Sequence, residues 1–548
     1  ETITNYYLPK DIIVKKIYLP EYPTENIPGG RRKPLATSDL VRTTNEGVVL
    51  VNWLGHGNPR VWAHEELFNR DQTISLLTNK DKLFVGIAAT CDFGRYDMPE
   101  TKSGTEELLF YRKGGAIAFF SATRAVFTTE NRIFNQNIIS ELFSRNSDGN
   151  YQTIGKAYFL TKQVSISDNH RKYILFGDPL ITLKIPDKVI KLDKVNKIDL
   201  NRVTRDTSLA IKAYSLLNLE GSIITPKDSS LVSNFNGIIE IVINDVGFTK
   251  IVTDIDGTKH NIYKDGGTIA KGFSKVTNGK FSCEFFITDE VSFLSGNISI
   301  RMFAFDTTNN IFAKGLESRL KISGIDTIST FKDNEPPVIS IFIDDTTFKP
   351  GDIVSNPPTL IVKLYDNTAI NTTGVGIGHL IEAWVDGGQE SIDLTNEFES
   401  LVDNPKEGII TKVLPKLAPG SHTVKVRAWD IFNNYSIATT VFNILDTSAG
   451  IFLMNPIVKP NPATNNVTFR IQHNINEPYE VVLEIFNIFG QKVFEKSEDF
   501  NKLMNFEISY HCTDQFGNGL PTGIYIYSIK AKTSNKNASI NGKFAIVR

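Results

Sequence analysis

The chain changes its sequence pattern near residue 186, and this change limits the folds that it can adopt. Up to about residue 186, short apolar runs alternate with stretches of helical periodicity. Beyond that point, strand patterns are separated by Gly, Asn, Asp and Pro. The first pattern is typical of a parallel sheet with crossover helices, and the second is typical of β-sandwiches. We therefore predict a multidomain protein that is α/β at first and all-β afterwards.

The α/β part contains two predicted helices and four predicted strands. A capping box at Ser103–Glu106 opens a helix that extends to Lys113, and apolar residues at helical spacing mark a second helix over Asn131–Phe143. The strands are short apolar runs bounded by Gly or polar residues, as expected for a sheet that is covered on both faces. These runs are Ile12–Leu19, Gly47–Leu54, Leu83–Ala89 and Gly115–Phe120.

The all-β part is too long for one core, so we predict three β-sandwich, Ig-like modules. Asn334–Pro337 and Asp446–Pro462 are interpreted as linkers between these modules. The predicted domains are then residues 1–186, 187–333, 334–446 and 450–548. Strands are expected at Ile238–Ile243, Phe281–Ile287, Ile298–Phe305, Leu360–Tyr365, His422–Asp430 and Tyr479–Phe486.

Composition argues against several classes of function. A net charge of −2 provides no broad basic surface, so we expect no nucleic-acid partner. No apolar run reaches the roughly 18 residues of a membrane helix, so any membrane association would go through a partner or a lipid. Cys91, Cys283 and Cys512 are too few and too far apart for a disulfide framework or a structural zinc site. Because Glu1–Thr4 does not open a signal peptide, we expect that the chain begins inside a larger protein.

A histidine and a cysteine each follow one of the predicted strands. His56 comes after Gly47–Leu54, and Cys91 comes after Leu83–Ala89. The carboxyl ends of parallel strands share the edge of a sheet where ligands bind, so the two side chains could meet there. An imidazole can take the thiol proton and leave a thiolate that attacks a carbonyl. The alternative, equally weighted on the local pattern, is a buried structural cysteine and an ordinary loop histidine.

The backbone beside this pair offers hydrogen-bond donors. Glycines on both sides of His56 would let a substrate backbone approach closely. The N–H groups of Gly57 and Cys91 are our candidates for an oxyanion hole. No acidic residue that would orient the imidazole can be assigned, and Glu65, Glu66 and Asp92 are not favoured for that role.

Four segments resemble, in the same order, motifs of the gingipain family of cysteine peptidases. The resemblance implies a caspase-like fold with Cys91 as nucleophile and His56 as its base. Family catalytic domains have a preceding subdomain, so residues 1–186 are expected to be the C-terminal part of one. The segments are Asn52–Gly57 (histidine motif), Ala88–Asp97 (cysteine motif), Gly114–Ala118 with Ser121–Arg124, and Leu175–Pro179.

The same resemblance implies substrate-binding residues. In the family, the segment after the third strand borders the substrate pocket, which makes Ser121, Thr123 and Arg124 candidates. An ordinary polar loop is the equally weighted alternative. His64 and His170 are interpreted as surface or structural histidines, and Gly177–Pro179 as a turn.

Two further resemblances lie in the all-β part. Asp366-Asn367, with Gly374–His379 and Val385–Gly388, is similar to the region after the peptidase in the signal peptidases of the type IX secretion system. The last 90 or so residues resemble the C-terminal sorting domain of that system, a small β-sandwich, with a generic β-sandwich as the alternative. The segments that carry this second likeness are Lys459–Pro462, Val482–Val493, Leu520–Tyr525 and Gly542–Arg548.

Together these resemblances imply a peptidase and sortase at the cell surface, on the extracellular face of the outer membrane. It would remove the sorting domain from type IX cargo proteins and transfer the cargo to anionic lipopolysaccharide through a Cys91 thioester. Its implied partners are the cargo, the lipopolysaccharide, the outer-membrane β-barrel shuttle PorV and the missing N-terminal part of the same protein. The alternatives are a secreted gingipain-like endopeptidase and a non-catalytic surface scaffold or adhesin.

No cofactor is required by this chemistry. Asp366–Thr373 is rich in oxygen-bearing side chains and could hold a structural calcium ion, which needs several oxygen ligands. A polar loop is the commoner reason for such a composition.

Overall fold

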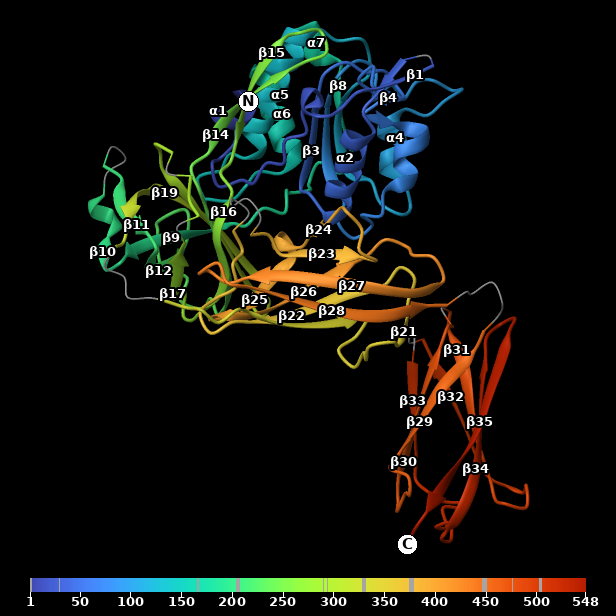
Figure 1. The fold of residues 1–548 in the computed structure, drawn as a ribbon. Helices are drawn as coiled ribbons and strands as arrows, with labels where there is room; N and C mark the ends of the chain where they lie inside the picture. Colours follow the sequence, from blue (N-terminus) through green and yellow to red (C-terminus); the bar gives the residue numbers. More distant parts are fainter. Residues whose placement is uncertain are drawn as a thin grey trace. The chain divides into compact units, whose positions relative to one another are not determined.

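The computed structural model divides the chain into two compact units, Glu1–Ser329 and Thr330–Arg548. Figure 1 shows helices in the early part of the first unit and strands through the rest of the chain. The residues that the structure describes are 2–28, 30–164, 167–203, 207–288, 290–292, 294–327, 332–373, 379–445, 451–475, 477–501 and 505–548.

The first unit contains a four-stranded sheet in the order β3-β6-β7-β8. Its first three strands are parallel, and β8 is antiparallel to β7. All six residues of β6 are buried, which is why this run is apolar without alternation. The bounds are Leu50–Leu54 (β3), Phe84–Ala89 (β6), Ala116–Ala122 (β7) and Tyr173–Phe176 (β8).

Helices cover both faces of this sheet (Figure 1). Leu108 of α4 (Gly104–Phe110) and Leu40 of α2 (Pro34–Glu46) pack in the core on one face. The other face packs on α5 (Thr128–Leu142) and α6 (Ile154–Val164). The structure confirms the predicted capping box, in which the Ser103 hydroxyl accepts from the Glu106 amide and the Glu106 carboxylate accepts from the Ser103 amide.

The predicted strand at Ile12–Leu19 is wrong, because the structure has no strand among these residues. Ile12 packs against the core, but Ile13 is exposed, and Lys15 and Lys16 interrupt the apolar run. The remaining short elements here are α1 (Thr2–Tyr6), η1 (Leu19–Glu21), β1 (Glu25–Ile27), β2 (Gly30–Arg32), β4 (Val61–Trp62), β5 (Phe68–Asn69), α3 (Arg70–Thr73), η2 (Ile74–Leu76) and α7 (Asp168–Arg171).

The rest of the first unit is a nine-stranded sheet with the main path β16-β13-β18-β19-β9-β12-β17 and a separate β14-β15 hairpin. Alternate residues of β13 and β18 are buried, as expected for strands with one face on a core. The bounds are β9 Lys188–Val195, β10 Ile198–Asp199, η3 Leu200–Arg202, β11 Leu209–Ala213, β12 Ser215–Ile224, β13 Gly237–Asn244, β14 Phe248–Thr253, β15 Lys259–Lys264, β16 Thr268–Val276, β17 Lys280–Ile287, β18 Ile298–Asp306 and β19 Ile311–Ile325.

The second unit begins with two sheets that share one apolar core, in the orders β20-β22-β26-β25 and β21-β28-β27-β23-β24. Leu360 and Val362 from the first sheet pack with Val424 and Val426 from the second. The bounds are β20 Val338–Ile343, β21 Ile353–Val354, β22 Thr359–Tyr365, β23 Glu382–Val385, β24 Ile392–Asp393, η4 Thr395–Glu397, β25 Phe398–Leu401, β26 Asn404–Val413, β27 Gly420–Trp429 and β28 Tyr435–Ile444.

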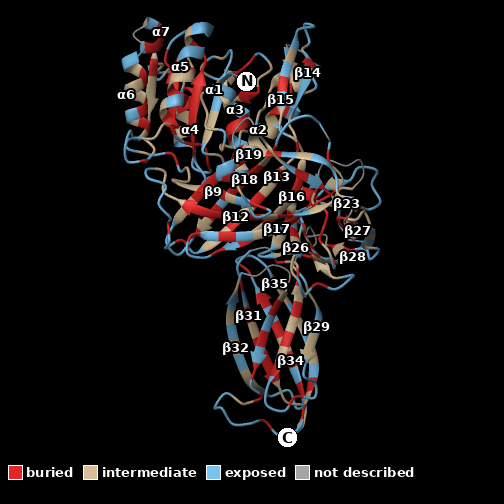
Figure 2. Ribbon diagram, turned by 90° about the vertical axis from the view of Figure 1, so that its left-hand side faces the viewer, coloured by how far each residue is buried: buried red, intermediate tan, exposed pale blue. Residues whose placement is uncertain are grey.

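A second pair of sheets follows, in the orders β29-β30-β33 and β32-β31-β34-β35, again around one core. Figure 2 shows buried residues alternating with exposed or intermediate ones along β34. The bounds are β29 Leu453–Lys459, β30 Val467–His473, β31 Tyr479–Phe486, β32 Lys492–Phe500, β33 Asn505–Tyr510, β34 Gly523–Lys532 and β35 Asn537–Ile546.

The structure confirms the predicted change from mixed α/β to predominantly β architecture. All six predicted strands of the later part are present, as β13, β17, β18, β22, β27 and β31. The motif residues Gly374–Gly378 and residues 446–450 of the second predicted linker lie outside the described residues. The bounds of the four predicted domains stay a prediction. Within the described ranges, none of the helices has the length and apolar character needed to cross a membrane.

Candidate active site

Parallel strand pairing brings His56 and Cys91 to one edge of the first sheet. Leu54 at the end of β3 is paired with Ala89 at the end of β6, so each predicted catalytic residue lies two positions past a paired strand end. The Gly55 amide still reaches the Ala89 carbonyl oxygen at 3.5 Å. The predicted shared edge is therefore present.

The loop after β3 is fixed by its own hydrogen bonds. The carbonyl oxygen of His56 accepts from the Ala63 amide at 2.9 Å and from the Trp53 indole at 3.1 Å. The loop also touches the strand end that carries the cysteine. A Cβ added at Gly57 would lie 2.6 Å from the Thr90 hydroxyl oxygen, so only glycine allows this close approach.

The thiol of Cys91 lies at the border of the apolar core. It is half-buried, and its Sγ is 3.4 Å from both the amide nitrogen and the carbonyl oxygen of Val126. Burial, and then the nearby cysteine sulfur, raises the pKa of the Tyr173 phenol far above its ordinary value, so this group stays protonated. Within the described ranges, no hydrogen bond joins the thiol directly to the imidazole of His56.

The two predicted oxyanion-hole donors are backbone amides of the loops at this edge. Neither the Gly57 amide nor the Cys91 amide donates to a protein acceptor in the described part of the chain. Free donors beside a nucleophile are what an oxyanion hole requires. The assignment of these two groups as the oxyanion hole stays a prediction.

The imidazole of His56 is exposed and lies beside His64, with ring centroids 5.6 Å apart. No carboxylate among the described residues hydrogen-bonds to His56. Glu65 and Glu66 instead lie within ion-pair distance of Arg31 (3.4 Å) and Arg32 (2.8 Å).

The three predicted substrate-binding residues lie in different environments. Ser121 is fully buried, beside Gly94, and Thr123 donates its hydroxyl proton to the Lys172 carbonyl oxygen at 3.1 Å. Arg124 alone has a substantially exposed side chain. Substrate binding by these three residues stays a prediction.

Sequence reasoning missed the partner of Arg124. Its guanidinium makes a bidentate contact with Asp97, at 3.0 and 2.5 Å, and this hydrogen bonding lowers the pKa of the Asp97 carboxyl. Such a pair fixes the orientation of the guanidinium plane. Asp97 could have been noticed in the sequence, because it ends the same segment that contains Cys91. Nothing in the sequence, however, showed that its carboxylate pairs with Arg124.

Comparisons with known proteins identify two regions of the chain. Residues 1–184 match the model of peptidase family C25, and residues 451–545 match the CHU_C type IX secretion signal domain. The comparison with curated proteins found no match to the chain.

Solved structures include two similar proteins. The crystal structure of dimeric latent PorU from Porphyromonas gingivalis is 25% identical, with a TM-score of 0.34, over 79% of this chain and 41% of that one. The Arg-specific cysteine proteinase gingipain R (RgpB) is 16% identical, with a TM-score of 0.26, over 52% of this chain and 56% of that one.

The chain therefore spans less than two thirds of the length of either solved protein. The two family matches nevertheless cover both of its distinctive regions, the sheet edge with Cys91 and His56 and the final pair of sheets. In one chain, residues 1–184 thus match the model of peptidase family C25, and residues 451–545 match the model of a type IX secretion signal domain.

Proposed function

We propose that this chain provides the catalytic Cys-His part of a cell-surface peptidase and sortase of the type IX secretion system. The observation that carries the proposal is the presence of both a C25 peptidase region and a type IX secretion signal domain in one chain. The substrate would be a cargo protein whose own sorting domain is removed at the cell surface.

In the proposed reaction, His56 takes the thiol proton and the Cys91 sulfur attacks the scissile carbonyl carbon. The N–H groups of Gly57 and Cys91 stabilise the oxyanion that forms. The C–N bond then breaks, His56 protonates the departing amine, and a thioester on Cys91 remains.

A second nucleophile completes the reaction. Water, or an amine on anionic lipopolysaccharide, attacks the thioester carbon and loses its proton to His56, and the C–S bond breaks to restore the thiol. Attack by water gives hydrolysis, and attack by the amine attaches the cargo to the lipid. We propose that two partners take part: the preceding subdomain that gingipain-family catalytic domains have, which completes the site, and the shuttle PorV, which holds the enzyme at the outer membrane.

The test is processing of a purified cargo that carries a sorting domain, followed by mass spectrometry. The complete protein is compared with its Cys91→Ala variant and with Cys283→Ala, which removes the other half-buried thiol, on β17 of the nine-stranded sheet. We expect Cys91→Ala alone to abolish cleavage, and a lipid-linked product to appear when lipopolysaccharide is supplied. Equal cleavage by the complete protein and Cys91→Ala would disprove the assignment of the nucleophile. Cleavage without any linked product would leave a peptidase and disprove the sortase step.

A further inference from the structure

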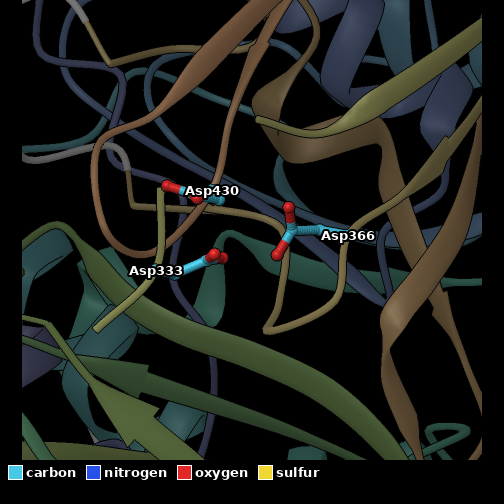
Figure 3. Close-up of side chains that lie close together, drawn as sticks. All are labelled: Asp333, Asp366 and Asp430. Carbon is cyan, nitrogen blue, oxygen red and sulfur yellow. The ribbon is translucent and has the colours of Figure 1, made fainter. Parts of the chain in front are cut away.

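Three aspartates from separate segments meet at one end of the first pair of sheets in the second unit. Asp366 directly follows β22 of one sheet, and Asp430 directly follows β27 of the other. Asp333 lies in the segment before β20. One carboxylate oxygen from each residue lies within 4.8 Å of the other two (Figure 3).

These carboxylates are withdrawn from water. Asp430 is 0% exposed and Asp366 is 2% exposed, whereas Asp333 is half-buried. In the described ranges, no lysine or arginine forms an ion pair with any of the three. Buried carboxylates without a cation are costly unless something neutralises them.

The hydrogen bonds of the cluster hold the side chains in place and leave one oxygen unused. Asp366 Oδ1 accepts from the amides of Thr368 (2.7 Å) and Ala369 (3.1 Å), and Asp430 Oδ1 accepts from the Asn434 amide at 2.7 Å. Asp366 Oδ2 is buried, and no hydrogen bond reaches it from the described residues. Figure 3 shows the carboxyl groups of Asp366 and Asp333 turned toward one another.

We propose that Asp333, Asp366 and Asp430 bind a calcium ion that joins the ends of the two sheets. Calcium accepts six to eight oxygen ligands and tolerates irregular geometry, which suits carboxylates held on three different segments. Magnesium requires a near-ideal octahedron and gives up its water reluctantly, so it fits a buried, preformed cluster less well. The ion would neutralise the buried charge and fix the strand ends at β22 and β27.

This site differs from the predicted one. The sequence suggested that a continuous run, Asp366–Thr373, holds the ion. Only Asp366 of that run belongs to the cluster. The other two aspartates lie 33 residues before it (Asp333) and 64 residues after it (Asp430). The proposal does not depend on the peptidase function, because no residue of the Cys91 edge belongs to the cluster.

The first experiment measures thermal unfolding of the full chain with EDTA, with 5 mM CaCl₂ or with 5 mM MgCl₂. Because calcium binds only the folded site, we expect it to raise the melting temperature by roughly 5 °C, and magnesium to have a clearly smaller effect. Asp366→Asn and the more exposed Asp333→Asn should each lose most of the calcium shift. In EDTA, Asp366→Asn should melt above the natural protein, because it removes one of the buried charges.

The matched control is Asp514→Asn, since Asp514 accepts backbone amides in a turn as Asp430 does but lies outside the cluster. It should keep the full calcium shift. Direct binding is measured with Tb³⁺, whose luminescence Trp429, the residue before Asp430, can sensitise, and calcium should displace it. The proposal is overturned if calcium gives no shift and displaces no Tb³⁺. It is equally overturned if magnesium acts as strongly as calcium, or if both cluster variants keep the full shift.

Discussion

Gly57 packs so closely against Thr90 that a single methyl group at Gly57 would lie 2.6 Å from the Thr90 hydroxyl oxygen. This contact joins the loop of His56 to the strand end that precedes Cys91. It therefore sets how the two predicted catalytic groups are spaced, without any direct bond between them.

The substitution Gly57→Ala should separate the two loops. The new methyl would also meet the Val61 carbonyl oxygen at 2.8 Å, so the loop must shift. Because a displacement of about 1 Å can cost about 10²-fold in rate, we expect cargo cleavage to fall by about that factor, measured as kcat. Gly523→Ala, where the nearest atom would be 3.8 Å away, is the control and should cleave normally. Normal cleavage by Gly57→Ala would contradict the prediction.

His56 and His64 lie side by side, but only His56 is predicted to act as the base. His56→Ala should lower cargo cleavage by about 10²- to 10⁴-fold, the range typical of a lost general base. His64→Ala should leave cleavage within a few-fold of the natural rate. Iodoacetamide should alkylate Cys91 more slowly at pH 7 in His56→Ala, but not in His64→Ala. Peptide mass spectrometry measures this rate. Equal losses in both variants would show that the assignment of the base is wrong.

The hydroxyl of Thr90 is buried, and it makes no hydrogen bond within the described ranges. Replacing it with a methyl in Thr90→Val should raise the free energy of unfolding by about 1 kcal/mol, because an unsatisfied buried hydroxyl is removed. Thr123→Val is the matched comparison and should lower the free energy of unfolding, because the Thr123 hydroxyl donates a hydrogen bond to the Lys172 carbonyl oxygen. Urea denaturation followed by fluorescence measures both. A loss of stability in Thr90→Val would count against this explanation.

The region that matches the type IX secretion signal domain, residues 451–545, should lose stability in mild acid because of His473. Burial lowers the pKa of this histidine from 6.5 to about 4. Its Nδ1 accepts from the Ile475 amide at 3.0 Å, which assigns the proton of the neutral ring to Nε2, 2.8 Å from the Tyr479 hydroxyl. As the pH falls, His473 therefore becomes protonated near pH 6.5 in the unfolded chain, but only near pH 4 in the folded domain.

The stability from this group is then fully present above pH 6.5 and is lost as the pH falls toward 4, by about 3 kcal/mol in all. Scanning calorimetry of the full chain between pH 4 and pH 7.5 measures the effect. His473→Gln should flatten the pH dependence of the signal-domain transition, whereas His511→Gln, at an exposed position, should retain it. An unchanged slope in His473→Gln would contradict the prediction.

The sequence by itself determined the change from α/β to β architecture and placed His56 and Cys91 at one edge of a sheet. Strands β3 and β6 were predictable because a strand buried on both faces must be apolar throughout, and residues that follow parallel strands must share an edge. The strands of the later part were predictable for a similar reason, because alternating burial leaves a period of two in the sequence. The strand predicted at Ile12–Leu19 was wrong, because an apolar run forms a strand only where a neighbouring strand is present to pair with it.

Only the tertiary structure decided the contacts between segments that are distant in the chain. The closeness of Gly57 to Thr90, the pairing of Asp97 with Arg124 and the burial of Ser121 follow from how loops pack, and packing leaves no local period. The aspartate cluster shows the same limit. Calcium ligands can come from any segments that the fold brings together. The continuous oxygen-rich run therefore indicated only one proposed ligand, Asp366. Asp333 and Asp430 could be recognised only from the tertiary structure, which places them beside it.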